Sequence, residues 1–243
     1  MDARNSKPDS IPARFGLKAD FVIDVGSGVS SIYFAKADKL LALADPEHSV
    51  IVADSLTRAF VPACYPDDRI LTVPKGEDAK SPEALIRLWE GFQELGLGRD
   101  WTVVGIGGGS VSDLAGFAAS TWMRGVNFGF VPTTLLAMVD ASVGGKNGIN
   151  LCGKKNQVGS IAQPGFVLID TSMLASLGPQ ELASGMAEAL KHGILDGESH
   201  LCAIERAAAS MDAKNLEAVI RLSVGLKASI VQNDKKESGQ HMP

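Results

Sequence analysis

Short apolar runs alternate with longer amphipathic stretches over roughly the first two thirds of the chain. Five runs are brief and mostly β-branched, as buried parallel strands are: residues 49–54, 69–73, 101–106, 128–131 and 166–170. Stretches with helical spacing lie between them, at residues 81–95, 111–121 and 132–140. This alternation predicts an α/β fold, in which a mostly parallel sheet is covered by helices on both faces.

Beyond residue 177 the pattern changes, because no further run rich in Val and Ile occurs. Residues 179–194, 199–209 and 212–232 all have helical spacing. The change predicts a boundary near residues 171–178. We therefore expect an α/β domain over residues 1–176 and a helical segment over residues 177–243, the start of a domain rather than a whole one.

Composition narrows the class of protein. Apolar residues make up 45% of the 243 residues and charged residues 21%, which is typical of a globular protein. The net charge of −5 argues against a nucleic-acid or anionic-membrane partner. Cys64, Cys152 and Cys202 form no CxxC pair and are expected to be reduced thiols. With no apolar run long enough for a membrane span and no secretory signal, the sequence predicts a cytoplasmic protein.

Three consecutive glycines at residues 107–109 follow a predicted strand, and Ser110 and Asp113 come directly after them. Glycines here let the backbone turn sharply and bring its N–H groups against a pyrophosphate at the start of a helix. The spacing differs from the GxGxxG fingerprint. A tight strand-to-helix turn without a ligand is the alternative.

The segment from residue 131 to 156 is rich in glycine, lysine and amide side chains. Residues 144–146 read Gly-Gly-Lys, which predicts a loop that presents Lys146 between Asp140 and the Lys155–Asn156 pair. Such a set suits an anionic ligand with many hydroxyl groups. The alternative is a solvated loop with ordinary surface lysines.

Glu188 and Lys191 are three residues apart in a predicted helix, so both side chains lie on one face. Glu188 could ligate a metal while Lys191 holds a phosphate or carboxylate beside it, and an exposed ion pair within the helix is the alternative. His192 is offset from Lys191 by about 100° around the helix. We expect it to be a helix C-terminal histidine rather than a ligand.

The blocks GGGSVSDLAGFAAS, VPTTLLAMVDASVGGKNGIN and GMAEALKHG resemble the 3-dehydroquinate synthase family of sugar-phosphate cyclases. The resemblance extends from about residue 50 to 240, whereas iron-dependent alcohol and glycerol dehydrogenases share only the GGGSxxD loop. It implies a Rossmann-like NAD-binding domain, followed by an incomplete, all-helical C-terminal domain. It also implies recycled NAD, one divalent metal (zinc or cobalt), a seven-carbon sugar acid phosphate as substrate, a phosphate-eliminating lyase and a homodimer.

The resemblance also implies a role for individual positions. Cofactor positions are Asp54, Glu77, Lys80, Gly108, Gly109, Ser110, Asp113, Thr133, Thr134, Lys155, Met173 and Ser176. Substrate positions are Arg124, Asp140, Lys146, Asn156, Lys191 and Lys227. Lys146, Lys191 and Glu237 are implied to be catalytic, and Glu188 is implied to be the metal ligand.

The end of the sequence departs from the family pattern. The family continues after Glu237 with an arginine and several histidines, whereas His241 stands in the arginine position here. Because one carboxylate does not fill the three protein positions of a catalytic zinc, the sequence predicts no stoichiometric metal and activity near background. Three hypotheses remain open: a C-terminally truncated 3-dehydroquinate synthase, another NAD-dependent sugar-phosphate cyclase, and a non-catalytic NAD-binding remnant.

Overall fold

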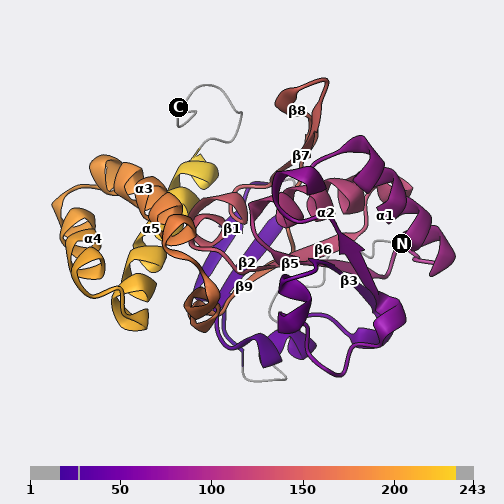
Figure 1. Cartoon of the computed structure of the whole chain (residues 1–243), viewed down its shortest axis with the longest axis horizontal. Coiled ribbons are helices and arrows are strands. Elements are labelled where there is room, and N and C mark those ends of the chain that lie inside the picture. The colour runs from indigo at the N-terminus through magenta and orange to yellow at the C-terminus, as the bar shows by residue number, and fades with distance from the viewer. Residues whose placement is uncertain (1–16, 27, 234–243) are drawn as a thin grey trace.

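A seven-stranded sheet lies at the centre of the computed structural model, which describes residues 17–26 and 28–233 (Figure 1). Its strands, in chain order, are β1 (Phe21–Asp24), β2 (Val29–Phe34), β3 (Ser49–Asp54), β4 (Ile70–Val73), β5 (Thr102–Gly107), β6 (Asn127–Pro132) and β9 (Phe166–Ile169). A separate hairpin consists of β7 (Lys146–Leu151) and β8 (Lys154–Ile161). The helices are α1 (Pro82–Glu94), α2 (Gly109–Thr121), α3 (Pro179–Asp196), α4 (Glu198–Ser210) and α5 (Ala213–Asn233).

The order β1-β2-β9-β6-β5-β3-β4 confirms the predicted parallel sheet, since only β1 is antiparallel to its neighbour. Strand β3 lies between β4 and β5, so the sheet grows first to one side of β3 and then to the other. In open α/β sheets, ligands bind outside the carboxyl ends of the strands at such a reversal. The reversal therefore places the expected ligand crevice between Asp54, at the end of β3, and Gly107, at the end of β5.

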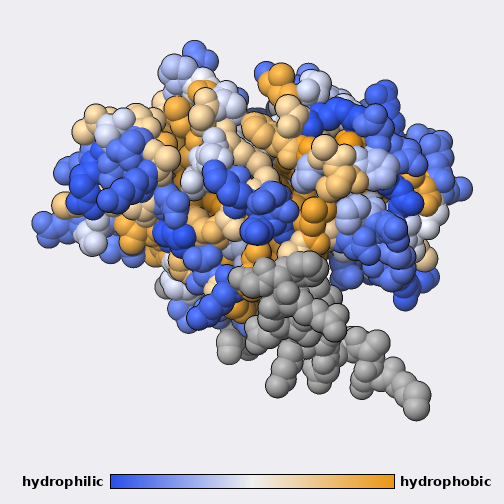
Figure 2. Space-filling view, turned by 90° about the horizontal axis from the view of Figure 1, so that it is seen from below, coloured by the Kyte–Doolittle hydropathy of each residue, from blue (hydrophilic) through white to orange (hydrophobic). Residues whose placement is uncertain are grey.

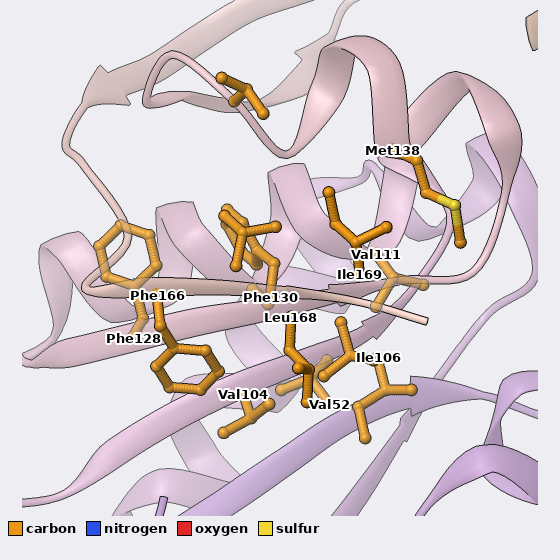
Figure 3. Packing of buried hydrophobic residues seen from close by; sticks show 14 of the residues in the cluster. Val52, Val104, Ile106, Val111, Phe128, Phe130, Met138, Phe166, Leu168 and Ile169 are labelled. Carbon is orange, nitrogen blue, oxygen red and sulfur yellow. The ribbon is translucent and has the colours of Figure 1, made fainter. Parts of the chain in front are cut away.

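Helices α1 and α2 lie above the sheet in Figure 1, and short helical turns of the indigo part of the chain lie below it. Figure 3 shows side chains of the strands packed together, among them Val104 and Phe130. Val111 of α2 and Met138 belong to the same buried cluster. The predicted cap of α1 is also confirmed, because Ser81 Oγ accepts a hydrogen bond of 3.2 Å from the backbone N–H of Ala84.

Two predictions in the middle of the chain need correction. The helix expected over residues 132–140 starts later, since Pro132 ends β6, and the helical segment covers residues 135–141, of which Ala137–Ala141 form a π-helix. The expected loop around Lys146 is the hairpin of β7 and β8. The hairpin sequence is polar and rich in glycine, so it lacks the alternation that is typical of a half-buried strand. Glycine is needed where the two strands approach closely, since a Cβ on Gly159 would lie 2.1 Å from the backbone oxygen of Asn147.

The three predicted C-terminal helices are confirmed, and the described residues after Ile169 contain no strand. Buried polar contacts lock these helices together: His200 lies between Asp196 of α3 (Nδ1–Oδ2, 3.0 Å) and Ser223 of α5 (Nε2–Oγ, 3.2 Å). His200 and Ser223 are buried, so this arrangement joins helices and offers no access to a substrate.

The surface of the described residues mixes polar and apolar side chains. On the face shown in Figure 2, hydrophilic residues gather towards the two ends and apolar residues lie in the band between them. Helix α3 exposes a stripe of Leu190, Ile194 and Leu195, which is typical of a surface that packs against other polypeptide. Among the residues described, no helix combines the length and the apolar character needed to cross a bilayer.

Candidate functional site

The glycine turn connects β5 to α2 at the carboxyl edge of the sheet. Its close packing explains why side chains are excluded there: a Cβ on Gly108 would lie 3.2 Å from Thr134 Cγ2, and one on Gly109 would lie 3.1 Å from Ala141 Cβ. The backbone N–H of Thr133 donates to the carbonyl of Gly107 at 2.9 Å. The structure thus brings Gly108, Gly109, Ser110, Thr133 and Thr134 together at the N-terminus of α2, where backbone N–H groups favour an anion.

Asp54 ends β3 on the other side of the crevice. Its Oδ1 accepts hydrogen bonds of 2.8 Å from the backbone N–H groups of Leu56 and Thr57. This carboxylate therefore fixes the turn that follows β3 and is buried there. Asp54 lies where the sheet topology predicts a ligand, and its Oδ1 already accepts the hydrogen bonds of the turn.

Lys80 is the centre of a buried network beside the glycine turn. Its Nζ donates to Asp113 Oδ2 at 2.5 Å and to the side-chain oxygen of Asn156. Only 6% of the Lys80 side chain is exposed. Burial raises the pKa of the Asp113 carboxyl, and the hydrogen bond from Lys80 opposes part of that rise. One lysine therefore links α2 to the hairpin.

Sequence reasoning did not single out Asn150, which joins the hairpin to the turn before α1. Asn150 Nδ2 donates to Glu77 Oε1 (2.8 Å), and its Oδ1 accepts from the backbone N–H of Asn156 (2.9 Å). The hydrogen bond from Asn150 is the largest influence holding the pKa of Glu77 below its usual value. Lys155 Nζ lies 3.6 Å from the same oxygen of Glu77. No residue spacing predicted this contact, because the hairpin itself was missed.

A second network surrounds the π-helix. Lys227 of α5 donates to the backbone carbonyl of Asp140 (2.6 Å) and to its Oδ1. Burial lowers the pKa of Lys227, and the charge of Lys146 lowers it further, while Asp140 opposes both. Asp140 also raises the pKa of Asp113, so the two networks are electrostatically coupled. π-Helices of this kind are frequent at functional sites.

Helix α3 brings Glu188 to the π-helix. Lys191 Nζ lies 3.5 Å and His192 Nε2 lies 3.4 Å from Glu188 Oε1. The prediction that His192 merely ends the helix is wrong: α3 continues to Asp196, and the fourth residue after Glu188 lies on the same face. Donor atoms of Asp140, Glu188 and His192 all lie within 4.8 Å of one another, a set that fits a divalent cation.

Gly185 explains how α3 comes so close. A Cβ at this position would lie 2.5 Å from Leu135 Cβ and 2.7 Å from the backbone nitrogen of Leu136, immediately before the π-helix. A larger residue would push the two elements apart. One turn further along α3, Glu188 reaches the face on which Asp140 lies.

Some predicted site residues lie elsewhere. Arg124 follows α2 and precedes β6, so it is at the opposite edge of the sheet from Gly107. Met173 is buried in the core, and the Ser176 hydroxyl donates to the Met173 carbonyl at 2.7 Å. Glu237 and His241 lie outside the described residues.

The family models and the curated relatives that match the chain indicate one family. The chain matches the family models described as 3-dehydroquinate synthase N-terminal, over residues 70–184, and 3-dehydroquinate synthase C-terminal, over residues 185–243. It is 44% identical over 170 residues to a 3-dehydroquinate synthase of Pyrococcus abyssi, which covers 70% of this chain and 51% of that protein. The chain spans about half the length of the curated relatives it matches.

Two solved structures share the fold and carry ligands. A 2-epi-5-epi-valiolone synthase from Streptomyces hygroscopicus, with NAD⁺ and Zn²⁺ bound, has a TM-score of 0.76 and 28% identity; the match covers 88% of this chain and 63% of that one. A 2-deoxy-scyllo-inosose synthase complexed with carbaglucose-6-phosphate, NAD⁺ and Co²⁺ has a TM-score of 0.71 and 25% identity, over 90% and 64% of the two chains.

Proposed function

The chain belongs to the 3-dehydroquinate synthase family, and on that premise we propose that it provides the NAD site and much of the substrate site of this lyase. The reaction would convert 3-deoxy-D-arabino-heptulosonate 7-phosphate to 3-dehydroquinate and phosphate. The observation that carries the proposal is the position of Lys80. It hydrogen-bonds both Asp113, a cofactor position by resemblance, and Asn156, a substrate position.

NAD would lie across the crevice between β3 and β5. The N-terminus of α2 offers Gly108, Gly109 and Ser110 to the pyrophosphate, which favours an anion. By resemblance, Asp54 would lie near the adenosine ribose, and Glu77, Lys80 and Asp113 would contact the rest of the cofactor. When bound, NAD would accept and return a hydride and a divalent cation at Glu188 would act as a Lewis acid.

The substrate anion would be held by lysines of the second network. Lys191 pairs with Glu188 and Lys227 pairs with Asp140, and Lys146 is near enough for its charge to lower the pKa of Lys227. Cations placed in this way bind phosphate and stabilise negative charge that develops when phosphate leaves. The Asp140 carboxylate would orient a substrate hydroxyl while Lys227 holds it in place.

Three further parts of the proposal concern the whole protein. An NAD-binding unit covers residues 1–176 and a helical metal and substrate unit begins at 177. The position of Arg124 at the far edge of the sheet supports a homodimer in which it serves the partner's site. The protein would act in the shikimate pathway, and its partner would be a small-molecule sugar acid phosphate. A cytoplasmic location fits such a biosynthetic role.

Binding measurements distinguish a 3-dehydroquinate synthase from another sugar-phosphate cyclase. Calorimetry on the NAD-loaded chain should show saturable binding of 3-deoxy-D-arabino-heptulosonate 7-phosphate, weakened at least about 10-fold in Lys227→Met because a charged hydrogen-bond donor is lost. Glucose 6-phosphate and sedoheptulose 7-phosphate serve as controls. Tighter binding of either control would favour another sugar-phosphate cyclase. If none of the three sugar phosphates binds, a non-catalytic NAD-binding remnant is favoured.

A further inference from the structure

His200 of α4 joins two other helices through one hydrogen bond to each. Its Nδ1 lies 3.0 Å from Asp196 Oδ2 of α3, and its Nε2 lies 3.2 Å from the Ser223 hydroxyl of α5. The imidazole and the hydroxyl are both buried. Because a carboxylate only accepts, Nδ1–H donates to Asp196, and Nε2 of the neutral ring accepts from Ser223. A directed hydrogen-bond chain therefore runs from α5 through α4 to α3.

The other contacts among these helices have less direction. Figure 1 shows α3, α4 and α5 packed together at one end of the molecule, and their buried side chains are mainly apolar. Apolar burial follows the area removed from water and has no direction, so it does not fix how far a helix is turned about its axis. Hydrogen bonds weaken steeply when they are misaligned. The chain through His200 therefore limits the rotation of α5.

The rotation of α5 matters because this helix carries Lys227. Lys227 follows Ser223 by four residues, so the two side chains lie on one helix face. Its Nζ donates to the backbone carbonyl of Asp140 at 2.6 Å and to the carboxylate of the same residue. A Cβ on Gly144 would lie 3.4 Å from Lys227 Cε, so the stem of the lysine also passes the residues just before β7.

Lys227 stays at Asp140 against an opposing tendency. Only 14% of its side chain is exposed, and burial lowers the pKa of its ammonium group. A buried ammonium loses its hydration, and the long lysine stem can carry the charge back to solvent when the helix that bears it is free to turn. Holding α5 in one rotation removes that alternative.

Helix α3 gives the hydrogen-bond chain a fixed end. A Cβ on Gly185 would lie 2.7 Å from the backbone nitrogen of Leu136, so α3 packs tightly beside the π-helix. Asp196 is the last residue of the same helix. Through His200, α5 is therefore held relative to the helix that packs against the π-helix, where Asp140 lies.

We propose that His200 is a positioning residue, which through Ser223 fixes the rotation of α5 and so holds Lys227 at Asp140 to receive the substrate anion. The inference rests on the proposed function for the role of Lys227 towards the substrate. It goes beyond that function because it gives a task to a buried imidazole that touches neither substrate nor cofactor. Cutting the hydrogen-bond chain should move Lys227 and leave NAD binding at α2 unchanged.

Nuclear magnetic resonance with isotope-labelled lysine reads the position of Lys227. A buried ammonium that is hydrogen-bonded to a carboxylate exchanges its protons slowly, and Lys227→Met identifies its signal by the loss. His200→Leu removes the acceptor and should abolish the signal. Ser223→Ala should do the same with a smaller change in shape. His200→Gln keeps a side-chain oxygen that can accept from Ser223, and it should retain the signal.

Ile204→Ala is the matched control, because Ile204 is buried in the same helix and lies outside the hydrogen-bond chain. It should lower stability and leave the Lys227 signal in place. The inference is overturned by a signal that persists in His200→Leu and Ser223→Ala, or that disappears equally in Ile204→Ala. A wild type without the slowly exchanging signal overturns it as well.

Calorimetry with 3-deoxy-D-arabino-heptulosonate 7-phosphate keeps this inference apart from the proposed function. On the NAD-loaded chain, His200→Leu and Ser223→Ala should each weaken binding at least about 10-fold, whereas His200→Gln and Ile204→Ala should stay within about 3-fold of the wild type. If the wild type binds no sugar phosphate while the Lys227 signal follows the variants as expected, only the proposed function is rejected. An unchanged affinity in variants that have lost the signal overturns the positioning role.

Discussion

Lys80→Met lowers the free energy of unfolding by about 3 kcal/mol at neutral pH, because the Asp113 carboxylate is left buried without its partner. The same change releases Asn156 from α2 and should weaken NAD binding. Urea denaturation of the wild type and the variant measures the loss of stability. Asp113→Asn combined with Lys80→Met is the matched control, and removing the buried charge should restore much of the loss.

The pH dependence follows from the raised pKa of Asp113. A carboxyl with a higher pKa in the folded state binds more protons there than in the unfolded state, so its contribution to stability falls as pH rises through that pKa. Without Lys80 the pKa rises further, because the opposing hydrogen bond is gone. The deficit of Lys80→Met should therefore be smaller at pH 5 than at pH 8. An equal loss of unfolding free energy at pH 5 and at pH 8 would contradict the view that Lys80 and Asp113 form a buried ion pair.

Gly185→Leu is expected to cost about 2 kcal/mol of stability, since the new side chain meets Leu135 and the backbone of Leu136. The shift of α3 should also separate Glu188 from Asp140, and so weaken binding of the substrate anion while NAD binding persists. Thermal unfolding followed by circular dichroism, with sugar-phosphate and NAD titrations on the folded protein, measures all three effects.

Ala183→Leu is the control for Gly185→Leu, because Ala183 is an exposed residue of the same helix. It should leave stability and sugar-phosphate binding near those of the wild type. Retained sugar-phosphate binding in Gly185→Leu would mean that the close packing at Gly185 does not position Glu188 against Asp140.

Strands with strong apolar character were predictable from the sequence, and weakly patterned elements were not. Runs such as SVIVAD are buried on both faces and follow directly from composition. Strands β7 and β8 lack that signal, because glycine and polar residues fill the positions of β7 that pack against α2, and β8 is exposed along almost its whole length. Strands β1 and β2 were also missed, although residues 21–34 hold a short apolar run on either side of a glycine turn.

The candidate site shows the same division. The family resemblance implies that Lys80 and Asp113 are cofactor positions, but only the fold shows that Lys80 also hydrogen-bonds Asn156. The sequence offset of His192 from its neighbour Lys191 gives no sign of its position, whereas its spacing of four residues from Glu188 places both on one helix face. Its burial depends on packing between α3, the π-helix and α5, which no local pattern encodes.

Calorimetric titration of NAD⁺ into the folded 243-residue chain tests the central claim, a dinucleotide site between β3 and β5. The account predicts saturable binding of one NAD⁺ per chain. In Asp113→Asn the affinity should fall at least about 10-fold, because a charged hydrogen-bond acceptor becomes neutral. Absence of NAD⁺ binding to well-folded wild-type protein, or an unchanged affinity in Asp113→Asn, would contradict it.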